Sequence, residues 1–179
     1  NGSESELRSR LDWTKKKPTL RNKQHWFKKG FTWTTVSGGG FSARYCEEGA
    51  LFDNGGCTLF ADENLLLLGG LINSKVADRY LEFLAPTLNF QPGDIGLIAI
   101  ETKIFTLKET LSNIVQHCID ISKSDWDSNE LSWSFQKNEL LIGSFKRVSD
   151  SLSAFKFRWT KSFAKLYLKE LDLNNILIE

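Results

Sequence analysis

The sequence predicts an α+β fold, in which a small, mostly antiparallel sheet packs against helices and a further helix lies near the C-terminus. Short segments that alternate bulky and polar side chains crowd residues 24–60 between glycine-containing turns, as half-buried strands do. Apolar residues at helical spacing dominate residues 62–171. The composition agrees, because 179 residues with 41% hydrophobic and 25% charged side chains are typical of one globular domain.

The strand segments come first in the chain. Residues 24–27 and 31–36 show the alternation, and residues 41–45 resume it after three consecutive glycines. Two further short strands are expected at residues 51–53 and 57–60, because turn-forming residues precede each of them. Their shortness and close spacing favour a compact antiparallel sheet.

A helical segment follows the sheet. Asp62 stands where an N-cap is expected, and the helical spacing continues to Leu84, just before Pro86. Gly69 and Gly70 lie inside this helix, although a glycine there costs about 1 kcal/mol relative to alanine. We therefore expect the helix to approach a strand closely at these two positions.

The middle of the chain mixes element types. Residues 91–94 are expected to form a turn, and the Ile- and Leu-rich residues 95–100 a buried strand. A second helix is expected over residues 107–119, with Thr106 as its cap.

The C-terminal third contains one long amphipathic segment. Residues 120–135 are polar and rich in tryptophan, which indicates an extended surface segment. A last helix is expected over about residues 148–171 from its broad apolar stripe, and Asn174 and Asn175 should end it. The longest nearly apolar run, residues 64–72, is far short of the roughly 20 residues that span a bilayer, so no membrane partner is expected.

No arrangement of residues indicates an active site or a metal site. Cys46, Cys57 and Cys118 are odd in number and lack zinc-site spacing, which predicts free thiols in a reducing cytoplasm. His25 and His117 are isolated. No nucleophile elbow, Walker loop or His-Glu-x-x-His motif occurs. We therefore expect no catalytic residue, no metal ligand and no cofactor-binding residue in this chain.

Charge is strongly segregated along the chain despite a net charge of +1. The first 45 residues contain ten Lys and Arg against three Asp and Glu, whereas residues 46–145 contain six against fifteen. The basic block also carries aromatic side chains, namely Trp13, Trp26 and Phe27. A basic block with interleaved aromatics is typical of a surface that binds a polyanion such as nucleic acid. The alternative is a solvated arm whose lysines serve only solubility.

Six stretches in order along the chain resemble the specificity region of BREX-type adenine-specific DNA methyltransferases, the PglX family of phage-defence proteins. They are GFTWT at 30–34, FSARY at 41–45, LGGLINSKVA at 68–77, PTLNFQPGDI at 86–95, IDISKSDWDS at 119–128 and LNNILIE at 173–179. The third and fourth stretches are shared more loosely with type I specificity subunits and type IIG enzymes. The resemblance covers about residue 25 to the end.

The resemblance implies a methyltransferase whose catalytic domain binds S-adenosylmethionine and flips an adenine out of the duplex for N6 methylation. The Asn/Asp-Pro-Pro-Tyr/Phe motif of that domain is absent here, since Pro18, Pro86 and Pro92 are isolated. This chain, which also lacks methionine, is therefore expected to be a piece of the enzyme that is inactive alone. It resembles the target-recognition domain, which selects the DNA sequence.

The expected organisation has three parts. Residues 1–23 form a basic arm, residues 24–122 a target-recognition-like α+β domain, and residues 123–179 a Trp-rich segment with the C-terminal helix, the start of a further helical region. Double-stranded DNA is the expected partner in a cytoplasmic protein. The acidic middle is expected to face the catalytic domain of the same chain, and other phage-defence subunits are further candidates. Two alternatives stay open: a type I or type IIG specificity domain, or an interaction domain with no nucleic-acid role.

The candidate DNA-binding residues fall into two groups. Phosphate contacts position a protein on DNA and are expected from accessible lysines, namely Lys15, Lys16, Lys17, Lys28, Lys29 and Lys75. Base contacts specify the sequence and are expected from polar residues of the sheet and its loops, namely Thr34, Thr35, Ser37, Arg44 and Asn54. Arg44 suits a bidentate contact with guanine. Its alternative is a salt bridge with Glu47 or Glu48, and the alternative for residues 73–75 is a helix-packing motif.

Overall fold

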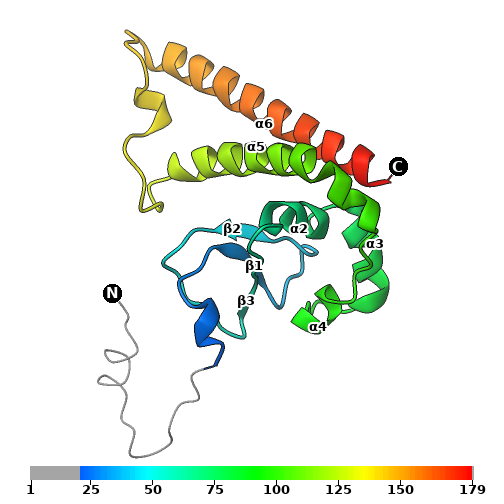
Figure 1. Cartoon of the computed structure of the whole chain (residues 1–179). Coiled ribbons are helices and arrows are strands. Elements are labelled where there is room, and N and C mark those ends of the chain that lie inside the picture. The colour runs from blue at the N-terminus through cyan, green and yellow to red at the C-terminus, as the bar shows by residue number, and fades with distance from the viewer. Residues whose placement is uncertain (1–20, 179) are drawn as a thin grey trace, which may run out of the picture.

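The computed structural model of the chain describes residues 21–178, and in that range three strands form one antiparallel sheet (Figure 1). Strand β1 (Gly30–Thr34) is central, between β2 (Arg44–Cys46) and β3 (Gly56–Leu59). Together with the helices, this sheet confirms the predicted α+β class. The helical elements, with η for a 3₁₀ helix, are η1 (Lys23–His25), α2 (Leu65–Ile72), α3 (Lys75–Leu84), α4 (Pro92–Ile95), η2 (Thr102–Leu107), α5 (Lys108–Asp127), η3 (Glu139–Leu141) and α6 (Val148–Ile178).

Alternation along β1 divides the sheet into an apolar and a polar face, because successive side chains of a strand point to opposite sides. Phe31 is buried, Thr32 is half-buried and Thr34 is exposed. The register carries this division onto β2, since Phe31 is opposite Tyr45 and Thr32 is opposite Arg44. The polar face is therefore the one that can meet a ligand.

Helix α2 packs on the apolar face of the sheet and forms the middle layer of the fold (Figure 1). A Cβ at Gly69 would lie 2.0 Å from the ring of Phe31, so only glycine permits this approach. Gly70 faces the other way, where a Cβ would lie 2.5 Å from the side chain of Val115 on α5. The predicted close approach to a strand is confirmed at Gly69, whereas Gly70 permits a contact between helices.

Helices α5 and α6 lie side by side and run antiparallel on the outer side of α2 (Figure 1). Leu111 of α5 is fully buried, and Leu173 of α6 belongs to the same core cluster as Phe31. One continuous core therefore extends from the sheet through α2 to the α5–α6 pair.

The single helix expected before Pro86 is in fact two helices, separated at Asn73 and Ser74. Ser74 is fully buried, and its hydroxyl accepts the N–H of Ala77 (3.2 Å) and donates to the carbonyl of Leu71 (2.6 Å). A serine that caps the second helix and also bonds the last turn of the first favours a break. The expectation that Asp62 caps the first helix is wrong, because α2 begins after Asn64.

Two of the expected N-terminal strands are wrong. Residues 24–27 overlap η1, which follows Asn22 in the left-handed conformation (φ 54°), and this turn directs the chain away from extended geometry. Residues 51–53 lie beside the sheet without strand pairing. Alternation of polar and bulky residues is also compatible with such irregular segments, so it does not by itself specify pairing.

The expected strand at residues 95–100 is also wrong, because the chain forms the short helix α4 and turns there. Ile95 and Ile98 are buried at a helical spacing of three, whereas Leu97 is 66% exposed. A short apolar run looks the same in sequence whether it forms a strand or helical turns.

Both long helices extend beyond their predicted ends. Helix α5 includes residues 120–127, and α6 passes through Asn174 and Asn175. The Asn174 amide donates to the carbonyl of Glu170 (2.8 Å) and accepts the N–H of Lys75 on α3 (2.7 Å), so it joins two helices without ending its own. Neither these helices nor any other within residues 21–178 are both long and apolar enough to cross a membrane.

Candidate nucleic-acid interface

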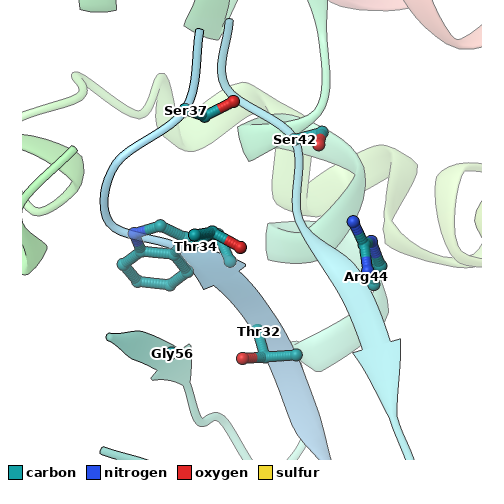
Figure 2. A pocket seen from close by; sticks show the side chains of 7 residues that line it. Thr32, Thr34, Ser37, Ser42, Arg44 and Gly56 are labelled. Atoms are coloured by element: carbon teal, nitrogen blue, oxygen red, sulfur yellow. The ribbon is translucent and has the colours of Figure 1, made fainter. Parts of the chain in front are cut away.

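A small hollow of about 120 Å³ opens on the polar face of the sheet, and Figure 2 shows its lining. Three predicted base-reading residues line it together: Thr34 at the end of β1, Ser37 in the following loop and Arg44 at the start of β2. Thr32 and Ser42 were not predicted but also line it. The alternation of Ser42 with Arg44 is the sequence signal that could have indicated one of them.

Arg44 brings the only guanidinium into this hollow. Among the described residues its guanidinium has neither an ion pair nor a hydrogen bond. The alternative salt bridge is not formed, because Glu47 pairs with Lys123 of α5 and the Glu48 carboxylate lies in a different hollow. The hydrogen bond from Lys123 to Glu47 and the negative charge of that carboxylate raise the pKa of the lysine. The described part of the chain thus uses none of the five N–H donors of the Arg44 guanidinium.

The hydroxyl groups of the hollow differ in how far they are already bonded. Thr32 donates to the carbonyl of Cys57 (3.0 Å), and Ser37 accepts the N–H of Gly39 (3.4 Å). The hydroxyls of Thr34 and Ser42 bond no described residue. The hollow can therefore offer a guanidinium and two free hydroxyls, a set of donors suited to base edges or to phosphate oxygens.

Two other predicted base-reading residues, Thr35 and Asn54, do not line the hollow. Thr35 is only 8% exposed, and its hydroxyl donates to the backbone carbonyl of Asn54 (3.2 Å). Its own N–H donates to the carbonyl of Gly55 (3.2 Å). Thr35 is thus used to fasten the turn before β3 to the end of β1. The Asn54 side chain is exposed at that turn, without a hydrogen bond to the described part of the chain.

Residues 73–75 connect α2 to α3 and make packing contacts there, as the alternative of a helix-packing motif expects. Asn73 binds the backbone of Ala43, Ser74 caps α3, and the N–H of Lys75 donates to Asn174. The Lys75 ammonium forms an ion pair with the carboxylate of Asp78, one helical turn further along α3, at 3.2 Å. Lys75 therefore lies at the start of α3 and does not line the hollow.

Lys28 and Lys29 line a second hollow of about 380 Å³, formed mainly by residues before β1 and residues just after β3. Neither ammonium pairs with a carboxylate of residues 21–178, although Glu48 and Asp62 line the same hollow. The ring of His25 stacks there on Phe60, with 4.9 Å between ring centroids. The three other predicted phosphate contacts lie outside the described residues: Lys15, Lys16 and Lys17.

The thiols show no sign of nucleophilic or metal chemistry. All three cysteines are free, and no group of three or more His, Cys, Asp or Glu in the described range could hold a metal. Burial raises the pKa of Cys46 and Cys57, and burial together with Glu170 raises that of Cys118 to about 11. Such thiols stay protonated near neutral pH, and the thiol is the unreactive form.

The chain is similar to one segment of two curated adenine-specific methyltransferases. It is 36% identical over 174 residues to adenine-specific methyltransferase BrxX of Escherichia coli O9:H4 (strain HS), and 35% identical over 165 residues to adenine-specific methyltransferase PglX of Lacticaseibacillus casei (strain Zhang). These alignments cover 94% and 86% of this chain but only 14% and 13% of the relatives. No protein-family model matches the chain. The resemblance inferred from the six stretches is confirmed, for a segment about one seventh as long as its relatives.

Proposed function

We propose that this chain is the DNA-sequence-recognition module of an adenine-specific (N6) DNA methyltransferase in a bacterial phage-defence system. The observation that carries the proposal is the exposed guanidinium of Arg44, which has no partner among residues 21–178, beside the hydroxyls of Thr34 and Ser42, which likewise bond none of those residues, on the polar face of the sheet. An arginine without a carboxylate partner keeps its fork of donors open for the O6 and N7 atoms of guanine in the major groove.

The relatives support the same direction, since both are named adenine-specific methyltransferases. Such an enzyme needs a part that selects the site and a part that transfers the methyl group to the flipped base. The sequence has no Asn/Asp-Pro-Pro-Tyr/Phe motif, so we assign selection to this chain. S-adenosylmethionine would be held by another segment of the longer enzyme.

Lys28 and Lys29 are proposed to contact phosphates at the edge of this interface, with Lys15, Lys16 and Lys17 extending the basic block. Each phosphate neutralised by a lysine releases a counterion, so binding should weaken steeply as salt increases. Glu48 and Asp62 beside Lys28 and Lys29 reduce the local field. We therefore expect Lys28 and Lys29 to contribute less to the affinity for DNA than two lysines without acidic neighbours would.

The alternative function, an interaction domain without a nucleic-acid role, is favoured by one feature of α6. Trp159 and Phe163 stack on each other with 5.7 Å between ring centroids, yet they are 49% and 57% exposed. Exposed aromatic side chains are typical of surfaces that contact another protein. This feature lies on the outer helix layer and is compatible with DNA binding by the sheet.

The proposal is tested by fluorescence anisotropy of labelled duplex DNA with the 179-residue chain, over a range of salt concentrations. Arg44→Ala should weaken binding by about 1–3 kcal/mol, the worth of one good bidentate base contact. Arg79→Ala is the matched control, because it removes the same charge from the exposed face of α3, where Arg79 pairs with Glu82 (2.9 Å). Undetectable or salt-independent binding, or equal effects of the two variants, would refute the proposal.

A further inference from the structure

The backbone of Ala43 is held by one side chain, the amide of Asn73 at the end of α2. Its oxygen accepts the N–H of Ala43 (2.8 Å), and its nitrogen donates to the carbonyls of Ala43 (3.1 Å) and Gly69 (2.9 Å). Ala43 lies between Ser42 and Arg44, which both line the hollow. Two bonds to the same residue restrain its position and also the orientation of its peptide groups.

The loop that carries these residues has little other restraint on its return side. Gly38, Gly39 and Gly40 have open space where a Cβ would be, and β2 begins only at Arg44. Phe41 packs against the rings of Trp33 and Phe90, with 5.7 and 5.5 Å between centroids. Apolar packing of this kind is not directional, so it does not set the orientation of the next peptide units. Strand pairing begins only at Arg44, which is opposite Thr32, and the hydrogen bonds of Asn73 orient the Ala43 peptide groups just before that strand.

The side-chain amide of Asn73 can bond both the N–H and the carbonyl of Ala43, which aspartate and apolar side chains cannot do. An amide presents an acceptor and two donors at once, and here both donors reach carbonyls while the oxygen takes an N–H. An aspartate of the same shape would bring a carboxylate against the carbonyls of Ala43 and Gly69. A shorter or apolar side chain would leave the Ala43 peptide unbonded.

We infer that Asn73 is a positioning residue of the recognition surface: it sets where Ser42 and Arg44 stand without contacting the DNA itself. This inference rests on the proposed function, because it takes the hollow to be where DNA binds. It assigns to the α2–α3 joint a role beyond helix packing. Through Asn73, the α2–α3 joint fixes the backbone of Ala43 and thereby the positions of Ser42 and Arg44 relative to the helices.

The test compares Asn73→Ala with Asn174→Ala in the 179-residue chain. Asn174 makes the same kind of contact at the same joint, to the N–H of Lys75 and the carbonyl of Glu170, but it does not touch Ala43. Both variants lose hydrogen bonds of one asparagine, so urea denaturation should show similar losses of stability. Asn73→Asp is a third variant, which keeps the size and the acceptor but not the donors.

Only the Asn73 variants should disturb recognition. We expect Asn73→Ala to weaken binding to the labelled duplex of the anisotropy test roughly tenfold, as for the loss of part of a bidentate base contact. The salt dependence should stay that of the wild-type chain, because no phosphate contact is removed. The Ala43 amide should exchange its hydrogen at least about fivefold faster than in Asn174→Ala, as expected for the loss of one hydrogen bond.

Each result has a separate meaning. If Arg44→Ala weakens DNA binding but Asn73→Ala binds like Asn174→Ala, the positioning role is overturned and the proposed function stands. If the wild-type chain binds no duplex, the proposed function fails and the positioning role in recognition fails with it. If the Ala43 amide hydrogen exchanges at the same rate in Asn73→Ala and Asn174→Ala, Asn73 does not restrain the Ala43 backbone, whatever the DNA-binding result.

Discussion

Gly69→Ala tests the packing of α2 against the sheet. The added Cβ would lie 2.0 Å from the ring of Phe31, whereas ordinary contact begins at 3.4 Å, so the ring or the helix has to retreat by about 1.4 Å. Phe31 is 3% exposed and meets Tyr45 edge-on at 5.6 Å, so its ring is enclosed by the core and a shift would disturb that contact. Overpacking of this kind costs up to about 3 kcal/mol, and the better helix propensity of alanine returns about 1 kcal/mol.

The expected net loss is about 2 kcal/mol in the free energy of unfolding, or a decrease in Tm of about 4–8 °C for a chain of this size. Urea denaturation followed by tryptophan fluorescence measures it, since Trp33 is buried in the same core. Gly93→Ala in α4 is the control, because nothing lies within 4 Å of its added Cβ, and it should be neutral or slightly stabilising. If Gly69→Ala is as stable as the wild type, Phe31 yields more easily than its burial indicates and the argument is wrong.

Two further predictions concern the helix layer and the thiols. Leu111→Ala should lower the free energy of unfolding by about 2–5 kcal/mol, because the Leu111 side chain is fully buried. Phe163→Ala, on the exposed side of α6, should change it by less than about 0.5 kcal/mol. Similar losses of stability for the two variants in urea denaturation would contradict the assigned helix layers. The pKa of Cys118 is raised from 9.0 to about 11, so the folded chain holds this proton more tightly than the unfolded chain. Its contribution to stability is complete below pH 9 and is lost as pH rises to 11, and Cys118→Ser should show a weaker fall of stability over that interval.

The broad class of the fold could be predicted from local patterns, because alternation and helical spacing report which side of an element is buried. β1, β3 and the α5–α6 helices were therefore expected near their observed places. The segment at 95–100 could not be assigned correctly, since burial of Ile95 and Ile98 depends on which elements surround them. The joint at Ser74 was equally hidden, because a buried serine inside an apolar run is explained only by the two backbone groups it bonds.

The candidate site shows the same division. Arg44, Thr34 and Ser37 were expected from their polar character near strands, and the structure brings them to one hollow. Thr35 has the same chemistry in sequence, yet its hydroxyl is used by the backbone of Asn54. Residue type predicts what a side chain can bond, whereas its neighbours in space decide whether that capacity is still free.

By itself, the sequence determined the α+β class, the segregation of charge and the resemblance to the specificity region of adenine-specific methyltransferases. These properties depend on residues near each other in the chain. Only the tertiary structure decided that Glu47 pairs with Lys123, that Arg44 pairs with no carboxylate of residues 21–178, and that Asn73 bonds the backbone of Ala43. Those contacts join residues 76 and 30 positions apart, and such partners are chosen by how the layers pack.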